Sequence, residues 1–170
     1  MRGYPLGLVF VLCLAVFAAS ATADTSSSSD VVNPKTYGNC RVQTSVDMLT
    51  DEVTHLLMCA EETFLDATGV AIAALKGGIL MTMLTKGVMF HLNEEIPVAF
   101  RIDKGKLRKG QWYWEGNGAY TFDEHIATVL LNELPTGRRI AIQVGEESGH
   151  VVLDGSAAAV KDFLGRIGRQ

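Results

Sequence analysis

The chain has 170 residues and a formal net charge of −4, from 15 basic and 19 acidic side chains. This length suits one domain with a sizeable hydrophobic core. A mildly acidic chain lacks the concentrated positive charge with which proteins bind nucleic acid in bulk, so we expect no nucleic-acid partner.

The N-terminal residues have the pattern of a secretory signal peptide. Arg2 precedes an apolar run over residues 6–19, and a motif of small side chains follows at residues 21–23. The run is shorter than the about 20 residues that a membrane span needs. We therefore expect residues 1–23 to be a cleaved signal peptide, which leaves no integral membrane span and a periplasmic or secreted protein.

A serine-rich segment, DTSSSSDVVNPKT, occupies residues 24–36 and contains few large apolar side chains. Such a composition is typical of a flexible linker, so we expect a leader here. The remaining residues, 37–170, are predicted to form a single domain.

Two cysteines, Cys40 and Cys59, lie outside the predicted signal peptide, at the ends of two alternating segments. If these segments form a hairpin centred between Leu49 and Thr50, the two cysteines lie directly opposite each other. Opposed Cβ atoms are about 4.5–5.5 Å apart, close to what a disulfide needs, and an exported protein meets an oxidising compartment. We predict one structural disulfide. The alternative is a redox-active pair, which usually has the Cys-x-x-Cys spacing that is missing here.

Short apolar or alternating segments follow the hairpin and are separated by turns that contain glycine. This pattern predicts consecutive antiparallel strands. The expected strands are residues 69–75, 79–84, 88–92, 96–103, 111–114, 119–122, 139–144 and 150–153.

Two segments in the C-terminal half have the periodicity of helices. Asp123 is predicted to cap the first, which ends at Pro135, and Ser156 is predicted to cap the second, over residues 157–167. The elements together predict an α+β fold: an antiparallel β-sandwich or sheet with two helices in the C-terminal half and one hairpin disulfide.

The chain has no signature of a known catalytic or metal site. The hydrolase motif Gly-x-Ser-x-Gly is missing, and the four histidines are scattered without the spacing of metal ligands. Pairs of carboxylates occur in turn-like segments, where solvent exposure accounts for them. We expect no enzymatic activity, no cofactor and no bound metal. The alternative is an enzyme with an unrecognised site around His125 or His150.

The strongest candidate for a binding surface is a basic loop beside an aromatic strand. In alternation, Trp112 and Trp114 share one face of that strand, and the tyrosine between them takes the other. An exposed tyrosine beside several cations suits an anionic polymer, an acidic protein or a glycan. The alternative is that the tryptophans are core and the cations keep a hairpin soluble. The candidate residues are Lys104, Lys106, Arg108, Lys109 and Tyr113.

A series of short features resembles small exported proteins of Gram-negative bacteria. The features are Thr50-Asp51 near the hairpin turn, Arg-Ile-Asp at residues 101–103, a tryptophan strand, Glu-Leu-Pro-x-Gly at residues 133–137 and Leu-Asp-Gly-Ser at residues 153–156. Their order over residues 42–167 resembles the type VI secretion-associated periplasmic proteins and, less closely, the invasion-associated locus B family. The resemblance implies an exported β-sandwich protein of the envelope without a known enzymatic activity, and it carries over no catalytic residues.

Two functions of different classes fit these observations. The first is a non-enzymatic periplasmic or secreted accessory protein of the cell envelope, which acts through contacts with an envelope or host protein. The alternative is a secreted inhibitor of a lysozyme-like hydrolase, a role for which a small disulfide-linked domain with an acidic surface is suited.

Overall fold

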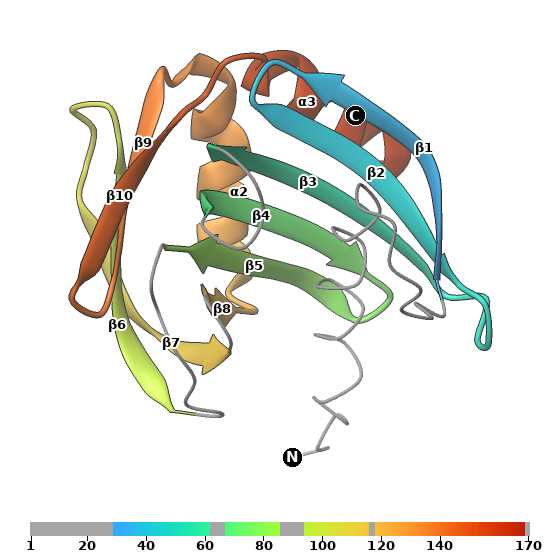
Figure 1. The fold of residues 1–170 in the computed structure, drawn as a ribbon, viewed down its shortest axis with the longest axis horizontal. Helices are drawn as coiled ribbons and strands as arrows, with labels where there is room; N and C mark the ends of the chain where they lie inside the picture. Colours follow the sequence, from blue (N-terminus) through green and yellow to red (C-terminus); the bar gives the residue numbers. More distant parts are fainter. Residues whose placement is uncertain (1–28, 62–66, 86–93, 116–117, 169–170) are drawn as a thin grey trace.

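The computed structural model describes residues 29–61, 67–85, 94–115 and 118–168. Within them, ten strands form one antiparallel sheet that curls around helix α2 (Glu124–Glu133), as Figure 1 shows. No helix in these ranges is long and apolar enough to cross a membrane.

The elements are short and closely spaced along the chain. The strands are β1 Ser29–Tyr37, β2 Cys40–Asp47, β3 Val53–Glu61, β4 Thr68–Leu75, β5 Gly78–Leu84, β6 Glu95–Ile102, β7 Arg108–Glu115, β8 Gly118–Thr121, β9 Arg139–Val144 and β10 Glu147–Val152. The second helix is α3 (Ser156–Arg166), and a 3-10 turn, η2 (Leu134–Thr136), extends the end of α2.

Most neighbours in the sheet are also neighbours in the chain. The strand order is β1-β2-β3-β4-β5-β8-β7-β6-β9-β10, and the pairings are antiparallel. The β5–β8 pairing joins two groups of hairpins into one surface. The predicted α+β class, with two helices in the C-terminal half, is therefore confirmed. The sheet is a single curled half-barrel rather than a sandwich, because α2 fills the space that a second sheet occupies in a sandwich.

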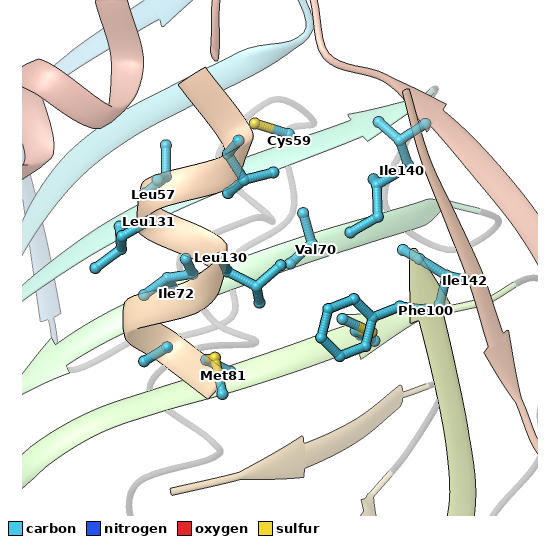
Figure 2. Packing of buried hydrophobic residues seen from close by; sticks show 14 of the residues in the cluster. Leu57, Cys59, Val70, Ile72, Met81, Phe100, Leu130, Leu131, Ile140 and Ile142 are labelled. Atoms are coloured by element: carbon cyan, nitrogen blue, oxygen red, sulfur yellow. The ribbon is translucent and has the colours of Figure 1, made fainter. Parts of the chain in front are cut away.

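The main hydrophobic core lies between the helices and the inner face of the sheet (Figure 2). Leu130 of α2, Ile72 of β4 and Phe100 of β6 belong to it, and each is at most 2% exposed. Burying a side chain of this size stabilises the fold by about 1.5–3 kcal/mol. The core thus draws on both groups of hairpins and holds the sheet in its curl.

A smaller buried cluster lies on the outer face of the sheet. It consists of Leu56, Ala71, Ala73, Leu80 and Tyr120. Since successive side chains of a strand point to opposite faces, β4 contributes to both clusters. This explains why its sequence, TGVAIAAL, is nearly continuously apolar instead of alternating.

The β2–β3 hairpin has the register that the sequence predicts. Cys40 pairs with Cys59, and Val46 pairs with Val53. The disulfide is formed across the open end of the hairpin, with the two Cα atoms 4.0 Å apart. Both cysteines are fully buried in the inner core, so the bond ties the hairpin at a point where α3 also packs.

Strand β1 departs from the flexible leader expected over residues 24–36. It pairs with β2 along the edge of the sheet, and most of its side chains are exposed. The pairing shifts between Val32 and Lys35, next to Pro34, which has no amide hydrogen to donate to the ladder. An edge strand made largely of polar residues carries little hydrophobic signal, which is why its composition is so similar to that of a linker.

The remaining strands agree with the sequence prediction except at their ends. Main-chain pairing begins at Arg108 in β7 and at Glu147 in β10, before the apolar residues that mark each strand in the sequence. The strand predicted at residues 88–92 lies outside the described residues. The predicted signal peptide, residues 1–23, and the first part of the leader, residues 24–28, also lie outside them.

Helix α2 begins where the sequence predicts and α3 begins one residue earlier, so only α2 has the predicted cap. Asp123 caps α2 by accepting hydrogen bonds from the amides of His125 and Ile126. Ser156 is instead the first residue of α3, and its side chain does not cap that helix. Its hydroxyl donates to the carbonyl of Leu134 at 2.7 Å, and this buried bond joins the start of α3 to the end of α2.

Candidate functional site

The basic loop predicted from the sequence is a short turn between β6 and β7. The amide of Gly105 donates to the carbonyl of Ile102 at 2.8 Å, and Asp103 has a positive φ of 49°. Asparagine and aspartate tolerate this region of backbone space better than other side chains with a Cβ. Lys104 and Lys106 therefore lie in a fixed turn, and both are exposed.

Asp103 also brings two arginines from a distant part of the chain to this turn. Its carboxylate accepts hydrogen bonds from the amides of Arg138 and Arg139 at 3.1 and 3.0 Å, and its own amide donates to the carbonyl of Arg139 at 2.9 Å. Both arginine side chains are exposed. The turn and the start of β9 thus form one basic surface.

The register of the sheet extends this surface along the outer face of β6, β7 and β9. Lys109 pairs with Ala99, and Arg101 pairs with Ala141. Residues placed diagonally on adjacent strands lie roughly 7–8 Å apart. Lys109, Arg101 and Arg139 consequently form a diagonal row of positive charge.

We name the basic side chains that these contacts gather the cationic patch. None of them has an ion pair within the part of the chain that the structure describes. Leu107, half exposed, adds an apolar side chain beside them. Charge concentrated in this way, on a chain whose formal net charge is −4, attracts an acidic surface. The cationic patch consists of Arg101, Lys104, Lys106, Lys109, Arg138 and Arg139.

Arg108, expected to share this surface, has a different environment. Its guanidinium donates two hydrogen bonds to the carboxylate of Glu133, at 2.6 and 3.1 Å, and lies 6.0 Å from the ring centre of Phe100. Its side chain is only 20% exposed. Arg108 therefore links β7 to the end of α2, because alternation turns it toward the inner face while Lys109 points outward.

Tyr113 lies on the outer face, as alternation predicts, and is 46% exposed, whereas Trp112 is buried against Phe100. The ring centre of Tyr113 lies 5.7 Å from the ring centre of Tyr120 on β8. Four strand positions, roughly 13 Å at about 3.3 Å per residue, separate Tyr113 from Lys109. The tyrosine shares a face with the cationic patch but lies beyond its edge.

Sequence reasoning missed Arg138 and Arg139 as members of this surface. In the sequence they follow a helix end and begin a strand, 36 residues after Asp103 in the case of Arg139. The pattern that could have indicated them is the isolated aspartate at the start of a basic turn, since a carboxylate there needs donors. Only the pairing of β6 with β9 identifies those donors.

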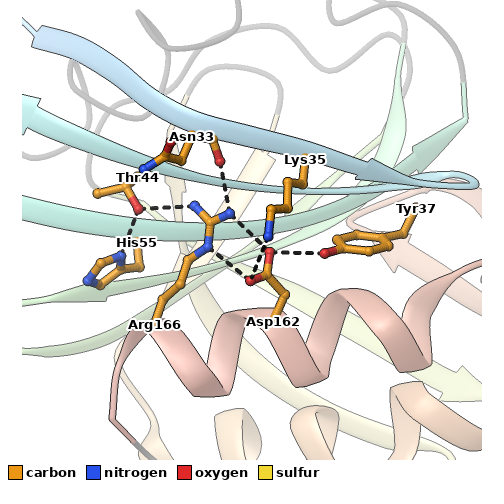
Figure 3. Close-up of polar contacts among 7 residues, drawn as sticks. All are labelled: Asn33, Lys35, Tyr37, Thr44, His55, Asp162 and Arg166. Atoms are coloured by element: carbon orange, nitrogen blue, oxygen red, sulfur yellow. Dashed lines mark hydrogen bonds and ion pairs between the residues drawn. The ribbon is translucent and has the colours of Figure 1, made fainter.

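A second polar group joins α3 to the edge of the sheet (Figure 3). Arg166 donates to the carbonyl of Asn33 at 2.8 Å, to the hydroxyl of Thr44 at 3.1 Å and to the carboxylate of Asp162 at 3.0 Å. The hydroxyl of Thr44 also lies 3.0 Å from Nδ1 of His55. Each of the two terminal guanidinium nitrogens thus has a protein acceptor.

Burial and charge set the protonation of this group. Burial lowers the pKa of His55 below its usual 6.5, and the positive charge of Arg166 lowers it further. Burial by itself raises the pKa of Asp162, but the hydrogen bonds and charge of Arg166, with smaller effects of Lys35 and Tyr37, outweigh it and bring the pKa below its usual 3.8. At neutral pH the group contains a neutral imidazole and an ion pair, an arrangement that fastens α3 to β1 and β2.

The two histidines proposed as alternative centres of a catalytic site lie on separate elements. His125 is exposed in the first turn of α2, and His150 is exposed on β10. Among the described residues, no group of three or more His, Cys, Asp or Glu side chains is arranged to hold a metal ion.

No family model matches the chain. No curated protein and no solved structure matches it significantly.

Proposed function

We propose that this protein is a non-enzymatic accessory protein, periplasmic or secreted, that binds an acidic protein partner on the cationic patch. The observation that carries the proposal is the gathering of six exposed cations, none ion-paired among the described residues, from two separate chain segments, residues 101–109 and 138–139. An exported location, expected from the N-terminal sequence, agrees with the disulfide, which persists in oxidising compartments.

The charge of the patch favours this function over inhibition of a lysozyme. A basic hydrolase is repelled by a surface of the same sign, whereas an acidic partner is attracted over several ångströms and oriented before contact. The half-exposed Leu107 gives such a partner an apolar contact within the charged area. Binding of this kind weakens as salt concentration rises, because dissolved ions screen exposed charges.

The test is affinity capture from envelope extract with the oxidised protein, followed by mass spectrometry. The patch variant is Lys104→Glu/Lys106→Glu. A matched control, Lys76→Glu/Lys161→Glu, changes the net charge equally at exposed positions outside the patch. Circular dichroism and urea unfolding confirm that each variant is folded.

A stoichiometric partner that the wild type and the control retain, and that the patch variant loses, supports the proposal. Binding should also weaken when salt is raised from low to physiological concentration. A partner that the patch variant retains removes this surface from the proposed function. Failure to retain any partner above background contradicts the accessory function.

A further inference from the structure

The turn between β2 and β3 is a rigid projection. The carboxylate of Asp47 accepts hydrogen bonds from the amides of Leu49 and Thr50 at 2.8 and 2.9 Å. These bonds hold the pKa of Asp47 below its usual range. The main chain closes the turn through bonds of 2.9 Å from the amide of Asp47 to the carbonyl of Glu52 and from the amide of Asp51 to the carbonyl of Asp47.

This turn presents apolar and acidic side chains to solvent together. Met48 is 62% exposed and Leu49 is 84% exposed, the largest exposed fraction among the large apolar side chains of the described residues. Asp51 and Glu52, beside them, are also exposed. The hydrogen-bonded turn thus carries two exposed apolar side chains next to two exposed carboxylates. We name residues 48–52 the acidic tip.

The charges of the acidic tip have little compensation within the molecule. Glu52 has an ion pair with Lys76 at 3.6 Å, but both side chains are more than half exposed, and such pairs contribute little. Asp51 has no ion pair among the described residues. The tip therefore remains a negatively charged surface with an apolar centre.

The cationic patch is the counterpart of this surface. It combines an exposed apolar side chain, Leu107, with exposed positive charge, as the acidic tip combines Met48 and Leu49 with exposed negative charge. Figure 1 shows the β2–β3 turn at the right end of the long axis and the β6–β7 turn at the left. Two complementary surfaces at opposite ends of a molecule cannot meet within one copy.

We propose that the acidic tip of one copy docks on the cationic patch of a second copy. This inference rests on the proposed function, because it names a second copy as an acidic partner that occupies the same patch. Such a contact is heterologous, so copies can add in a row. A contact made by one turn is smaller than a standard protein interface, and we expect association to be weak and sensitive to salt.

Sedimentation velocity of the purified, oxidised protein tests the proposal. The wild type should form dimers and larger species as its concentration rises through the micromolar range at low salt. Either the patch variant, Lys104→Glu/Lys106→Glu, or a tip variant, Leu49→Ser/Asp51→Asn/Glu52→Gln, should remain monomeric. Asparagine suits position 51 because its φ is +54°. Lys161→Glu, a charge change on the exposed side of α3, should associate as the wild type does.

Mixing the two monomeric variants gives the decisive result. The patch variant keeps an intact acidic tip and the tip variant keeps an intact cationic patch, so an equimolar mixture should form dimers of one of each and nothing larger. A mixture that stays monomeric overturns the proposal. So does a wild type that is monomeric throughout, or self-association that survives in either variant.

A parallel measurement separates this inference from the proposed function. Because the tip variant keeps its cationic patch, it should capture the envelope partner as the wild type does. Loss of self-association with unchanged capture supports both proposals. If nothing is captured but self-association depends on tip and patch as described, the envelope partner is rejected while the contact between copies holds.

Discussion

Arg166, in the last turn of α3, donates a hydrogen bond of 2.8 Å to the main-chain carbonyl of Asn33 in β1. Asn33 has a positive φ of 51° and lies where the pairing of β1 with β2 shifts. Asn33 has no partner residue in the ladder of β1 with β2, and its carbonyl accepts a hydrogen bond from the arginine. The C-terminal helix thus holds the first described strand of the sheet.

Replacing Arg166 with alanine should lower the free energy of unfolding by about 1.5–3 kcal/mol, the usual range for hydrogen bonds to charged groups. The Arg166 side chain is only 13% exposed, so solvent cannot fully replace its partners. Urea unfolding measures the loss, and hydrogen exchange locates it. The substitution should increase the exchange rate more in β1 than in β9, since Arg166 donates a hydrogen bond to β1. Equal loss of protection in both strands contradicts the local fastening.

The free energy of unfolding should decrease as pH falls from about 7 to 5, in part through His55. The folded protein depresses the pKa of His55 below that of the unfolded chain, about 6.5. The unfolded chain then binds more protons in this range, and stability that is present above the unfolded pKa is lost as pH falls through the folded pKa. His55→Gln should flatten the pH dependence measured by urea unfolding. An unchanged slope contradicts this role.

Reducing the Cys40–Cys59 disulfide should lower stability by about 3 kcal/mol, because closing a loop of this size restricts the unfolded chain. The two cysteines are 19 residues apart in the sequence. Comparing oxidised and reduced wild-type protein in guanidinium leaves the side chains otherwise unchanged, and Cys40→Ala/Cys59→Ala, which is insensitive to reductant, serves as the control. A reduced protein as stable as the oxidised one rejects the structural role.

Leu130→Ala should destabilise the protein by about 2–5 kcal/mol, since it leaves a cavity in the core that α2 forms with the sheet. Leu130 is fully buried, whereas Asn132, two residues later on the same helix, is exposed. Asn132→Ala therefore controls for the change in helix composition and should shift the urea midpoint little. A small effect of Leu130→Ala would show that the curled sheet does not depend on α2.

Arg108→Met should cost about 1 kcal/mol of stability and leave partner capture unchanged. The Arg108–Glu133 pair has two hydrogen bonds, but Glu133 is 38% exposed, so the interaction is partly screened by solvent. A double-mutant cycle with Glu133→Gln measures the coupling between the two side chains. If capture falls as far as in the patch variant while the protein stays folded, Arg108 belongs to the binding surface after all.

The β2–β3 hairpin could be predicted from its sequence down to the residue pairs. Its alternation is regular, its connection is short, and only one register brings Cys40 opposite Cys59 while matching the apolar faces. Helix α2 could also be predicted from the sequence, because Asp123 and the apolar stripe that follows lie within one local segment. In both cases the determining interactions join residues that are close in the sequence.

Only part of the candidate site could be predicted from the sequence, because some of its residues are far apart in the chain. Lys104, Lys106 and Lys109 lie within six residues of one another in the sequence, so their grouping could be predicted without knowledge of the fold. Whether Arg108 joins them depends on which face of β7 packs on α2, and Arg138 joins them only because Asp103 accepts its amide hydrogen across the β6–β9 pair. Strand β1 was missed because an edge strand with exposed polar side chains has no hydrophobic period.

The sequence by itself determined the class of fold, the disulfide and the location of the helices, because alternation, helical periodicity and capping are local properties of the chain. The tertiary structure alone decided that the sheet curls around α2 instead of forming a sandwich. It also decided which cations share a surface and that this surface lies at the opposite end of the molecule from the acidic tip. Those outcomes depend on side chains that meet only after distant strands pair and bury a common core.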